Sequence, residues 1–102
     1  MSNNIICIKL NSGEEIISKV NEFEDITKDD NIDLIEPRVL MAGPQGQLSL
    51  GPLMFSTNPD KPTKLKISSI SSYSEDVREE IKDGYIQSVS KLVIPNKSIL
   101  MG

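Results

Sequence analysis

Residues 10–20 have the sequence LNSGEEIISKV, in which a turn separates two apolar stretches. Residues 5–10, which lead into the turn, alternate between apolar and other side chains, the period-two pattern of a half-buried strand. Gly13 can adopt a positive φ without steric cost, and the asparagine and serine before it are also typical turn residues. Residues 15–23 are again rich in apolar side chains and are expected to form a second strand. The stretch therefore predicts an antiparallel β-hairpin.

The second strand is expected to bend strongly. Ile16 and Val20 lie on one face of it, with the small Ser18 between them. A small residue suits the concave side of a curved strand, where side chains crowd one another. Apolar residues also occupy both faces of some strands, as in Ile16-Ile17 and in the later run 53–55. Because a monomer would leave one such face in water, this pattern predicts assembly with further copies of the chain.

Three further strands complete the predicted sheet. Proline and glycine mark the turn at residues 43–46, and two prolines mark the loop at 56–62. Pro37 cannot donate a hydrogen bond to a neighbouring strand, so a bulge or an edge position is expected there. The three strands are expected over residues 32–41, 47–55 and 63–71. We expect all five strands to form a small, strongly bent barrel over about residues 5–71, SH3-like or Sm-like in kind.

The hydrophobic period changes after residue 71. Residues 72–75 read SYSE, which fits the capping box of a helix start. Apolar residues follow at four-residue spacing, at Val77, Ile81, Tyr85 and Val89. The pattern predicts an amphipathic helix over about residues 73–90, whose apolar stripe either packs on the barrel or forms a partner-binding groove. A short terminal strand is expected over about 92–95.

Composition is consistent with one domain over residues 1–102 and with a thin core. Of the 102 residues, 37% are hydrophobic and only 4% are aromatic, and tryptophan is absent. A domain of this size buries a modest share of its surface on folding, so further burial against other copies would stabilise it. A homo-oligomer is therefore expected.

The charge balance is acidic, with 11 basic against 15 acidic residues and a formal net charge of −4. Dedicated nucleic-acid binders usually carry a basic excess, so the overall charge argues against that class. The acidic residues concentrate in the first and last thirds of the chain. Four basic residues, Arg38, Lys61, Lys64 and Lys66, occupy the less acidic middle.

Few residues in the sequence suit catalysis or metal binding. The chain has no histidine, which removes the usual general base and the commonest zinc ligand. Cys7 is the single cysteine and lies in an apolar run, where it reads as a small strand hydrophobe. Counted from Asp25, the aspartates at residues 25–33 lack the glycine of a calcium loop, and Lys28 lies among them, so a solvated acidic loop is the better interpretation. We expect no enzyme activity, no cofactor and no metal.

No apolar stretch approaches the roughly 20 residues needed to cross a bilayer. The N-terminal residues MSNN lack the charged start and apolar core of a secretory signal. We expect no membrane association and a cytoplasmic location.

The pattern as a whole resembles the Sm-like fold of the spliceosomal Sm and LSm proteins and of the bacterial Hfq-type RNA chaperone. The first half of the Sm signature is matched at Leu10, Gly13, Ile16, Ser18, Val20 and Phe23, with the acidic Glu24 next. Residues 31–34, NIDL, resemble the start of the family's third strand. The chain departs from the family in that Ser18 replaces a second glycine and Ser68-Ser69 replaces the basic turn. In addition, the loop after Phe23 is longer, and the helix follows the barrel.

The chain looks most similar to the small Sm-like proteins of marine cyanophages and related tailed phages. The residues that carry this similarity are the segment GEEII at 13–17, the pair Glu36-Pro37, the strand at 67–70, and the acidic helix with Tyr85 that leads to Pro95. A phage origin would place the protein in the host-cell cytoplasm.

The family resemblance implies a ring of five to seven copies, joined by edge-strand pairing, that binds single-stranded RNA or DNA near its pore. By position, the two binding loops would be residues 23–32 and 66–70. In this interpretation Asn31 recognises base edges, because its amide both donates and accepts hydrogen bonds. Lys66 attracts phosphate. The residues expected at this site are Phe23, Asn31, Lys66, Ser68 and Ser69. Repetition around a ring would multiply each weak contact.

Four of these residues also have a purely structural interpretation. Asn31 suits a turn before a strand, Lys66 suits an outward strand position that keeps an edge soluble, and Ser68-Ser69 suits a hairpin turn. A ring with a structural or protein-interaction role, and no nucleic-acid partner, is the alternative function.

Overall fold

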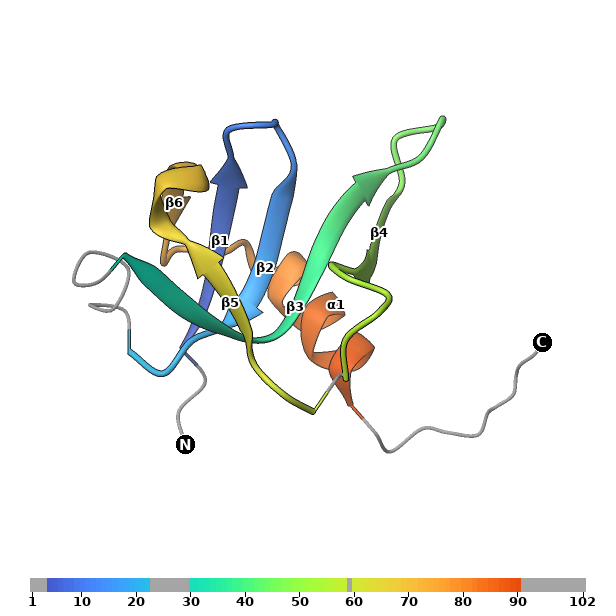
Figure 1. The fold of residues 1–102 in the computed structure, drawn as a ribbon. Helices are drawn as coiled ribbons and strands as arrows, with labels where there is room; N and C mark the ends of the chain where they lie inside the picture. The colour runs from blue at the N-terminus through green and yellow to red at the C-terminus, as the bar shows by residue number, and fades with distance from the viewer. Residues whose placement is uncertain (1–3, 23–29, 59, 91–102) are drawn as a thin grey trace.

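The computed structural model describes residues 4–22, 30–58 and 60–90, and in these ranges the protein is mainly β. Its strands are β1 (Ile5–Leu10), β2 (Glu15–Lys19), β3 (Asn31–Ala42), β4 (Leu48–Pro52), β5 (Thr63–Lys66) and β6 (Ile70–Ser74). One turn of 3-10 helix, Ile67–Ser69, joins β5 to β6, and the helix α1 spans Glu79–Val89. Figure 1 shows the arrangement of these elements.

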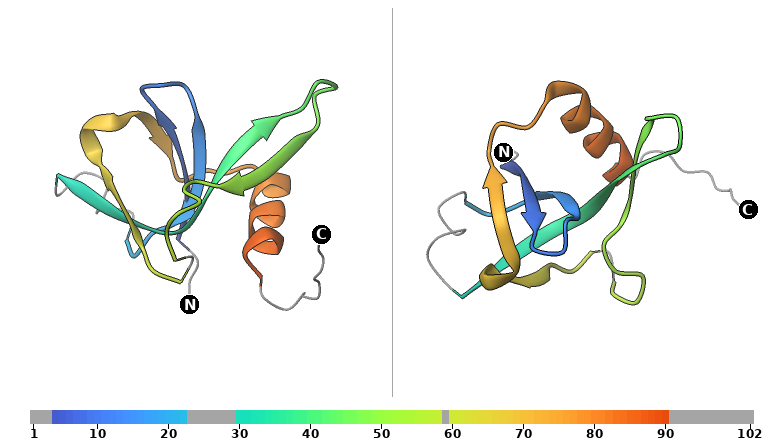
Figure 2. Two further views of the ribbon diagram at one scale, coloured as in Figure 1. Left: turned by 45° about the vertical axis from the view of Figure 1, so that its right-hand side comes forward. Right: turned by 90° about the horizontal axis from the view of Figure 1, so that it is seen from above.

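All strand pairs are antiparallel, in the order β4-β3-β2-β1-β6, and β5 pairs with β3. The long strand β3 has two sets of partners. Its first four residues pair with β5, and its later residues pair with β2 on one side and β4 on the other. In Figure 2 the β3–β4 hairpin extends away from the other strands. The predicted β-rich fold is confirmed at this level.

A bulge interrupts the pairing of β2 with β3. Ile17 faces Arg38 and Lys19 faces Ile35, so that Ser18 lies opposite two residues, Glu36 and Pro37. Glu36 has a φ of 53°, the left-handed conformation that residues other than glycine rarely adopt. The bulge expected at Pro37 is confirmed, and it bends β3 between its two sets of partners.

Two hydrophobic clusters lie on opposite faces of β1 and β2. The first contains Ile6, Ile8, Ile16, Val20, Ile32 and Leu34, and Leu65 of β5 packs against it. The second contains Ile5, Ile17, Val77, Tyr85 and Val89, which join β1 and β2 to the helical segment. Successive strand residues point to opposite faces, so neighbouring isoleucines divide between the two clusters.

The helix covers the strand face that the sequence suggested another copy would cover. Ile16 and Ile17 are 0% and 1% exposed within the single chain. The paired isoleucines therefore give no argument for assembly. Met54 and Phe55 differ, because they remain 46% and 90% exposed. The stripe packs in the core as expected: Tyr85 and Val89 of the helix are buried, Ile81 is partly buried, and Val77, which precedes the helix, is buried with them.

The fifth predicted strand, residues 63–71, is in fact two strands with a 3-10 turn between them. Asn11, in the turn after β1, holds this corner: its backbone N–H donates to the Ser69 carbonyl at 2.8 Å. Its side-chain amide donates to the Ser68 carbonyl at 2.9 Å. These two bonds hold the corner at which the chain leaves β5, which pairs with β3, and enters β6, which pairs with β1.

The capping box predicted at residues 72–75 is wrong. Ser72, Tyr73 and Ser74 lie in β6 and pair with Lys9, Ile8 and Cys7 of β1. The helix begins at Glu79, with Arg78 as its N-cap and no side-chain capping bond. Pairing with a neighbouring strand satisfies the backbone of these residues, which a helical turn would have satisfied only in part.

Other boundaries also differ from the prediction. β2 ends at Lys19 rather than at residue 23, and β4 ends at Pro52 rather than at residue 55. The terminal strand expected at 92–95 lies outside the described residues, as does most of the acidic loop after Glu22.

Candidate nucleic-acid interface

The structure places two of the predicted site residues directly opposite each other. Asn31 begins β3, Lys66 ends β5, and the two are paired in the antiparallel register. Both residues are exposed. The backbone N–H of Ile67 donates to the Asp30 carbonyl at 2.8 Å, which fixes this end of the strand pair. An amide and an ammonium group thus lie side by side on the same surface.

The two predicted serines lie in the 3-10 turn that follows Lys66. The Ser69 hydroxyl donates to the Lys66 carbonyl at 2.7 Å, and Asn11 binds the carbonyls of Ser68 and Ser69. The polar groups of Ser69 therefore serve the turn itself. Ser68 is exposed, and within the described ranges its hydroxyl makes no hydrogen bond. Phe23, the fifth predicted residue, lies outside the described residues.

The charges around Asn31 and Lys66 are mixed. Lys64, the next outward residue on β5, forms an ion pair with Asp33 at 2.8 Å. Among the described residues Lys66 has no ion-pair partner. A carboxylate repels a phosphate, because both are negative. Asp30 and Asp33 therefore reduce the attraction that Lys66 offers to a nucleic-acid phosphate. Within the described part of this surface, Lys66 is the basic residue without an ion-pair partner.

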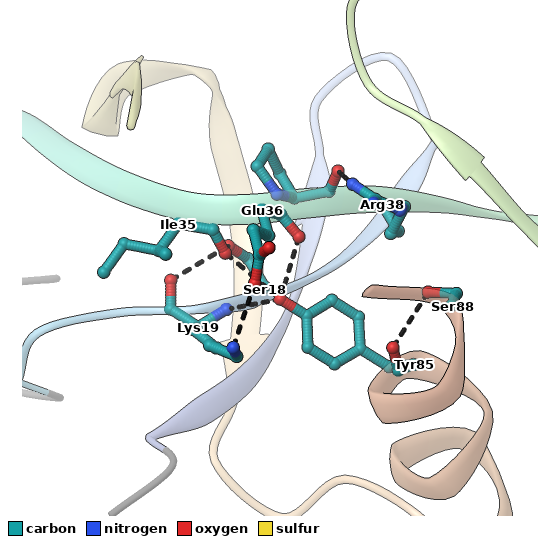
Figure 3. A network of polar contacts seen from close by, with 8 residues as sticks. Ser18, Lys19, Ile35, Glu36, Arg38, Tyr85 and Ser88 are labelled. Carbon is teal, nitrogen blue, oxygen red and sulfur yellow. Dashed lines mark hydrogen bonds and ion pairs between the residues drawn. The ribbon is translucent and has the colours of Figure 1, made fainter. Parts of the chain in front are cut away.

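A second polar cluster lies inside the molecule, at the bulge between β2 and β3 (Figure 3). The Tyr85 hydroxyl on α1 accepts a hydrogen bond from the Lys19 backbone N–H at 3.2 Å. It lies 2.8 Å from the Glu36 carbonyl and 3.1 Å from the Ile35 carbonyl, and can donate its proton to either. Burial, as the main cause, raises the pKa of Tyr85 to about 12. The phenol is therefore neutral at ordinary pH.

Two further contacts complete this internal cluster. The Ser18 hydroxyl lies within hydrogen-bond distance of the Lys19 carbonyl (2.9 Å) and the Ile35 carbonyl (3.1 Å). The Lys19 ammonium pairs with the Glu36 carboxylate at 2.9 Å. Each of these bonds satisfies a backbone group or a charge that the bulge would otherwise leave unpaired. The cluster stabilises the bulge and attaches the helix to the sheet.

Sequence reasoning found Ser18 and Tyr85 but assigned neither its hydrogen-bonding role. Tyr85 was expected only as part of an apolar stripe. A tyrosine in an otherwise aliphatic stripe is itself a signal, because a buried phenol hydroxyl usually has a polar partner. Asn11 was expected only as a turn residue.

Cys7, the single cysteine, lies partly buried in β1. Burial, more than the charge of Glu15, raises the pKa of the Cys7 thiol, which also contacts the Ser74 carbonyl at 3.5 Å. A raised pKa lowers the thiolate fraction and with it the nucleophilicity. Within residues 4–22, 30–58 and 60–90, no three potential metal-ligating side chains form a group. No helix in the same ranges is both long and apolar enough to cross a membrane.

Comparison with known proteins gives no assignment for this chain, since neither a family model nor a curated protein matches it.

Proposed function

We propose that this chain is a non-catalytic, Sm-like binding module that assembles into a ring and contacts single-stranded nucleic acid, with RNA as the first ligand to test and DNA as the second. The observation that carries the proposal is the pairing of Asn31 with Lys66 beside the 3-10 turn. Three segments that are distant in the sequence, residues 10–13, 30–33 and 66–69, meet there. The two loops implied by the Sm-like resemblance would contribute to a single surface.

The strand connections support a closed Sm-like or SH3-like barrel. β6 pairs with β1 at one end of the order, β5 pairs with the start of β3, and a single 3-10 turn joins β5 to β6. In this proposal the strands β1, β2, β3, β5 and β6 form the barrel, and the β3–β4 hairpin projects from it. The helix α1 covers the outer face of β1 and β2 (Figure 2).

The ring would form by pairing β4 of one copy with β6 of the next. These strands end the order β4-β3-β2-β1-β6, so each has one edge without a partner strand in the described part of the chain. Repeating the same head-to-tail contact closes a ring when the rotation between copies allows it. Met54 and Phe55, which follow β4, are exposed apolar residues that such a contact would bury.

The chemistry at the site suits weak, repeated contacts. An asparagine amide both donates to and accepts from a base edge, and a lysine ammonium attracts a phosphate as a point charge. One such pair binds weakly, but five to seven pairs around a ring act on the same strand of nucleic acid, so the overall affinity rises.

A ring with a structural or protein-interaction role is the second candidate. The observation that favours it is the charge of the site, where Lys64 is neutralised by Asp33 and Asp30 lies beside Lys66. The exposed Phe55 suits contact with a protein.

Fluorescence-anisotropy titration with short U-rich and A-rich RNA, and with DNA of the same sequences, separates the two candidates. The nucleic-acid proposal predicts binding at low salt that weakens as salt increases. Asn31→Ala and Lys66→Ala should each weaken binding about tenfold or more, because every copy in a ring loses the contact. Lys82→Ala on α1 removes the same charge away from the site and is the matched control.

Absence of binding at low salt would reject the nucleic-acid proposal. A ring in light scattering, together with no binding, would then support the structural candidate. Equal loss of affinity in Lys66→Ala and Lys82→Ala would show a general charge effect and would also argue against the site.

A further inference from the structure

A groove lies between the helix and the β3–β4 hairpin, with a volume of about 400 Å³. Its lining residues are Leu40, Leu48, Ser49, Leu50, Glu80, Ile81, Gly84 and Ser88. Figure 2 shows α1 alongside this hairpin. Leu50 and Ile81 also pack against the buried cluster that joins the helix to the sheet. The groove is therefore an open continuation of that core.

The groove leaves apolar surface exposed within the described part of the chain. Leu48, at its outer wall, is 47% exposed, although its neighbours Leu40 and Leu50 lie on the same face of the hairpin. Gly84 has no side chain and leaves the helix surface open at the middle of the groove. An apolar segment in this position would remove these leucines from water.

We propose that the C-terminal segment Leu92-Val93-Ile94 of the same chain docks in this groove. The helix ends at Val89, and Ser88, one residue earlier, already lines the groove. The chain therefore leaves the helix at one end of the groove. The proposal goes beyond the nucleic-acid function and does not depend on it.

The length of the segment fits. From Ser88 to Glu80 the groove follows eight helical residues, a span of about 12 Å. Four extended residues, 91–94, cover about 13 Å when they run back along the helix. Alternate side chains of an extended segment point the same way, so Leu92 and Ile94 would both face the groove. Pro95 follows directly and closes the apolar run.

The charges fit as well. The helix α1 carries the acidic residues Glu79, Glu80 and Asp83 and the single basic residue Lys82. Residues 91–102 contain Lys91 and Lys97 and no acidic side chain. A segment lying along the helix would thus bring positive side chains to a negative surface, and Lys91 would also lie at the negative end of the helix dipole.

Disulfide trapping in the full chain tests the proposal. In a Cys7→Ser background, Leu48→Cys combined with Ile94→Cys should form a disulfide within single chains. Its rate should be about tenfold above that of the control pair Phe55→Cys with Ile94→Cys, because docking raises the local concentration at the groove. Phe55 is 90% exposed and is not a groove residue. Equal rates, or disulfides formed only between chains, would overturn the proposal.

A second measurement leaves the groove residues intact. Methyl NMR spectra of the double variant Leu92→Ser/Ile94→Ser should show shifts at Leu40, Leu48, Leu50 and Ile81. The matched variant Ile99→Ser/Leu100→Ser, changed beyond Pro95, should leave these methyl signals in place. Unchanged groove signals in the first variant, or the same shifts in both, would contradict docking of residues 92–94.

Discussion

The hydroxyl of Tyr85 lies 2.8 Å from the carbonyl oxygen of Glu36, a residue 49 positions earlier in the chain. This contact joins the helix to the bulge of β3. The side chain of Tyr85 is fully buried, with 0% of its surface exposed. The helix is therefore attached to the sheet by a polar contact as well as by its apolar stripe.

Tyr85→Phe should lower the free energy of unfolding by about 1–3 kcal/mol. The ring would still fill its place in the core, but the Lys19 N–H and the Glu36 carbonyl would lose a partner in a buried position. Urea unfolding followed by circular dichroism measures the change. Tyr73→Phe is the matched control, because Tyr73 is 43% exposed, and it should change stability by less than about 0.5 kcal/mol. Equal effects of the two substitutions would contradict the role of the buried hydroxyl.

Tyr85 should also make stability fall at high pH. An unfolded tyrosine has a pKa of about 10, whereas burial raises the pKa of Tyr85 to about 12 in the fold. The folded state therefore holds the phenol proton more tightly than the unfolded state. This contribution is fully present below about pH 10 and is lost as the pH rises through about 12.

The measurement is a comparison of two proteins that differ only in the Tyr85 hydroxyl, so that the effect of pH on the rest of the chain cancels. The stability difference between the native chain and Tyr85→Phe should be constant up to about pH 10 and should shrink between about pH 10 and pH 12. Urea unfolding of both proteins across this range gives the difference. A difference that stays constant to pH 12 would refute the assignment.

At position 36, a glycine variant should be at least as stable as an alanine variant, which is the reverse of the usual order. Its φ of 53° costs a residue with a Cβ about 1–2 kcal/mol, and glycine avoids this cost. Both Glu36→Ala and Glu36→Gly lose the ion pair with Lys19, so the comparison isolates the backbone. We expect Glu36→Gly to be at least as stable as Glu36→Ala.

The matched pair for this comparison is Ser72→Ala and Ser72→Gly, at an exposed residue of β6 without positive φ. There alanine should be the more stable by about 0.5–1 kcal/mol. Thermal unfolding of the four variants gives both differences. The same order at the two positions would show that the bulge stores no backbone strain.

The edge of β4 that faces away from β3 should be sensitive to proline. The Gly43 N–H donates to the Gln47 carbonyl at 2.7 Å, so Gln47 turns its backbone groups toward β3. Backbone groups alternate along a strand, so those of Leu48 point to the edge that faces away from β3. Leu48→Pro therefore removes an edge donor and leaves the β3 pairing in place.

If copies assemble through this edge, Leu48→Pro should shift the mass in light scattering from the oligomer toward the monomer. Leu48→Ala removes the same side chain but keeps the N–H, and it should retain the oligomer. An oligomer that survives Leu48→Pro would exclude pairing at β4, and a monomeric native chain would reject the ring itself.

The sequence predicted local features well where one residue type restricts the backbone. The strand at residues 5–10 has the predicted bounds, and Pro37 lies in a bulge as expected. The period of the apolar residues also identified the buried face of the helix, since Tyr85 and Val89 are buried, although Val77 lies before the helix begins. These predictions depend on steric limits and on alternation within one segment, which the sequence displays directly.

The pairing between distant segments was harder to predict from the sequence. Residues 72–75 carry a helix-start motif, yet Ser72, Tyr73 and Ser74 are strand residues because β1 lies beside them. For the same reason residues 63–71 divide at a 3-10 turn, where Asn11 binds the corner. A sequence motif shows which secondary structure a segment prefers locally. A neighbouring strand that is distant in the sequence can outweigh this preference, because it supplies more backbone hydrogen bonds.

For the candidate site, the sequence alone determined which residue types are available: an amide at Asn31, an ammonium at Lys66 and an acidic chain without histidine. The tertiary structure alone decided that Asn31 faces Lys66, that Lys64 is neutralised by Asp33, and that the hydroxyl of Tyr85 reaches the bulge. The physical reason is that composition and period are properties of a segment, whereas each of these contacts joins segments more than 30 residues apart.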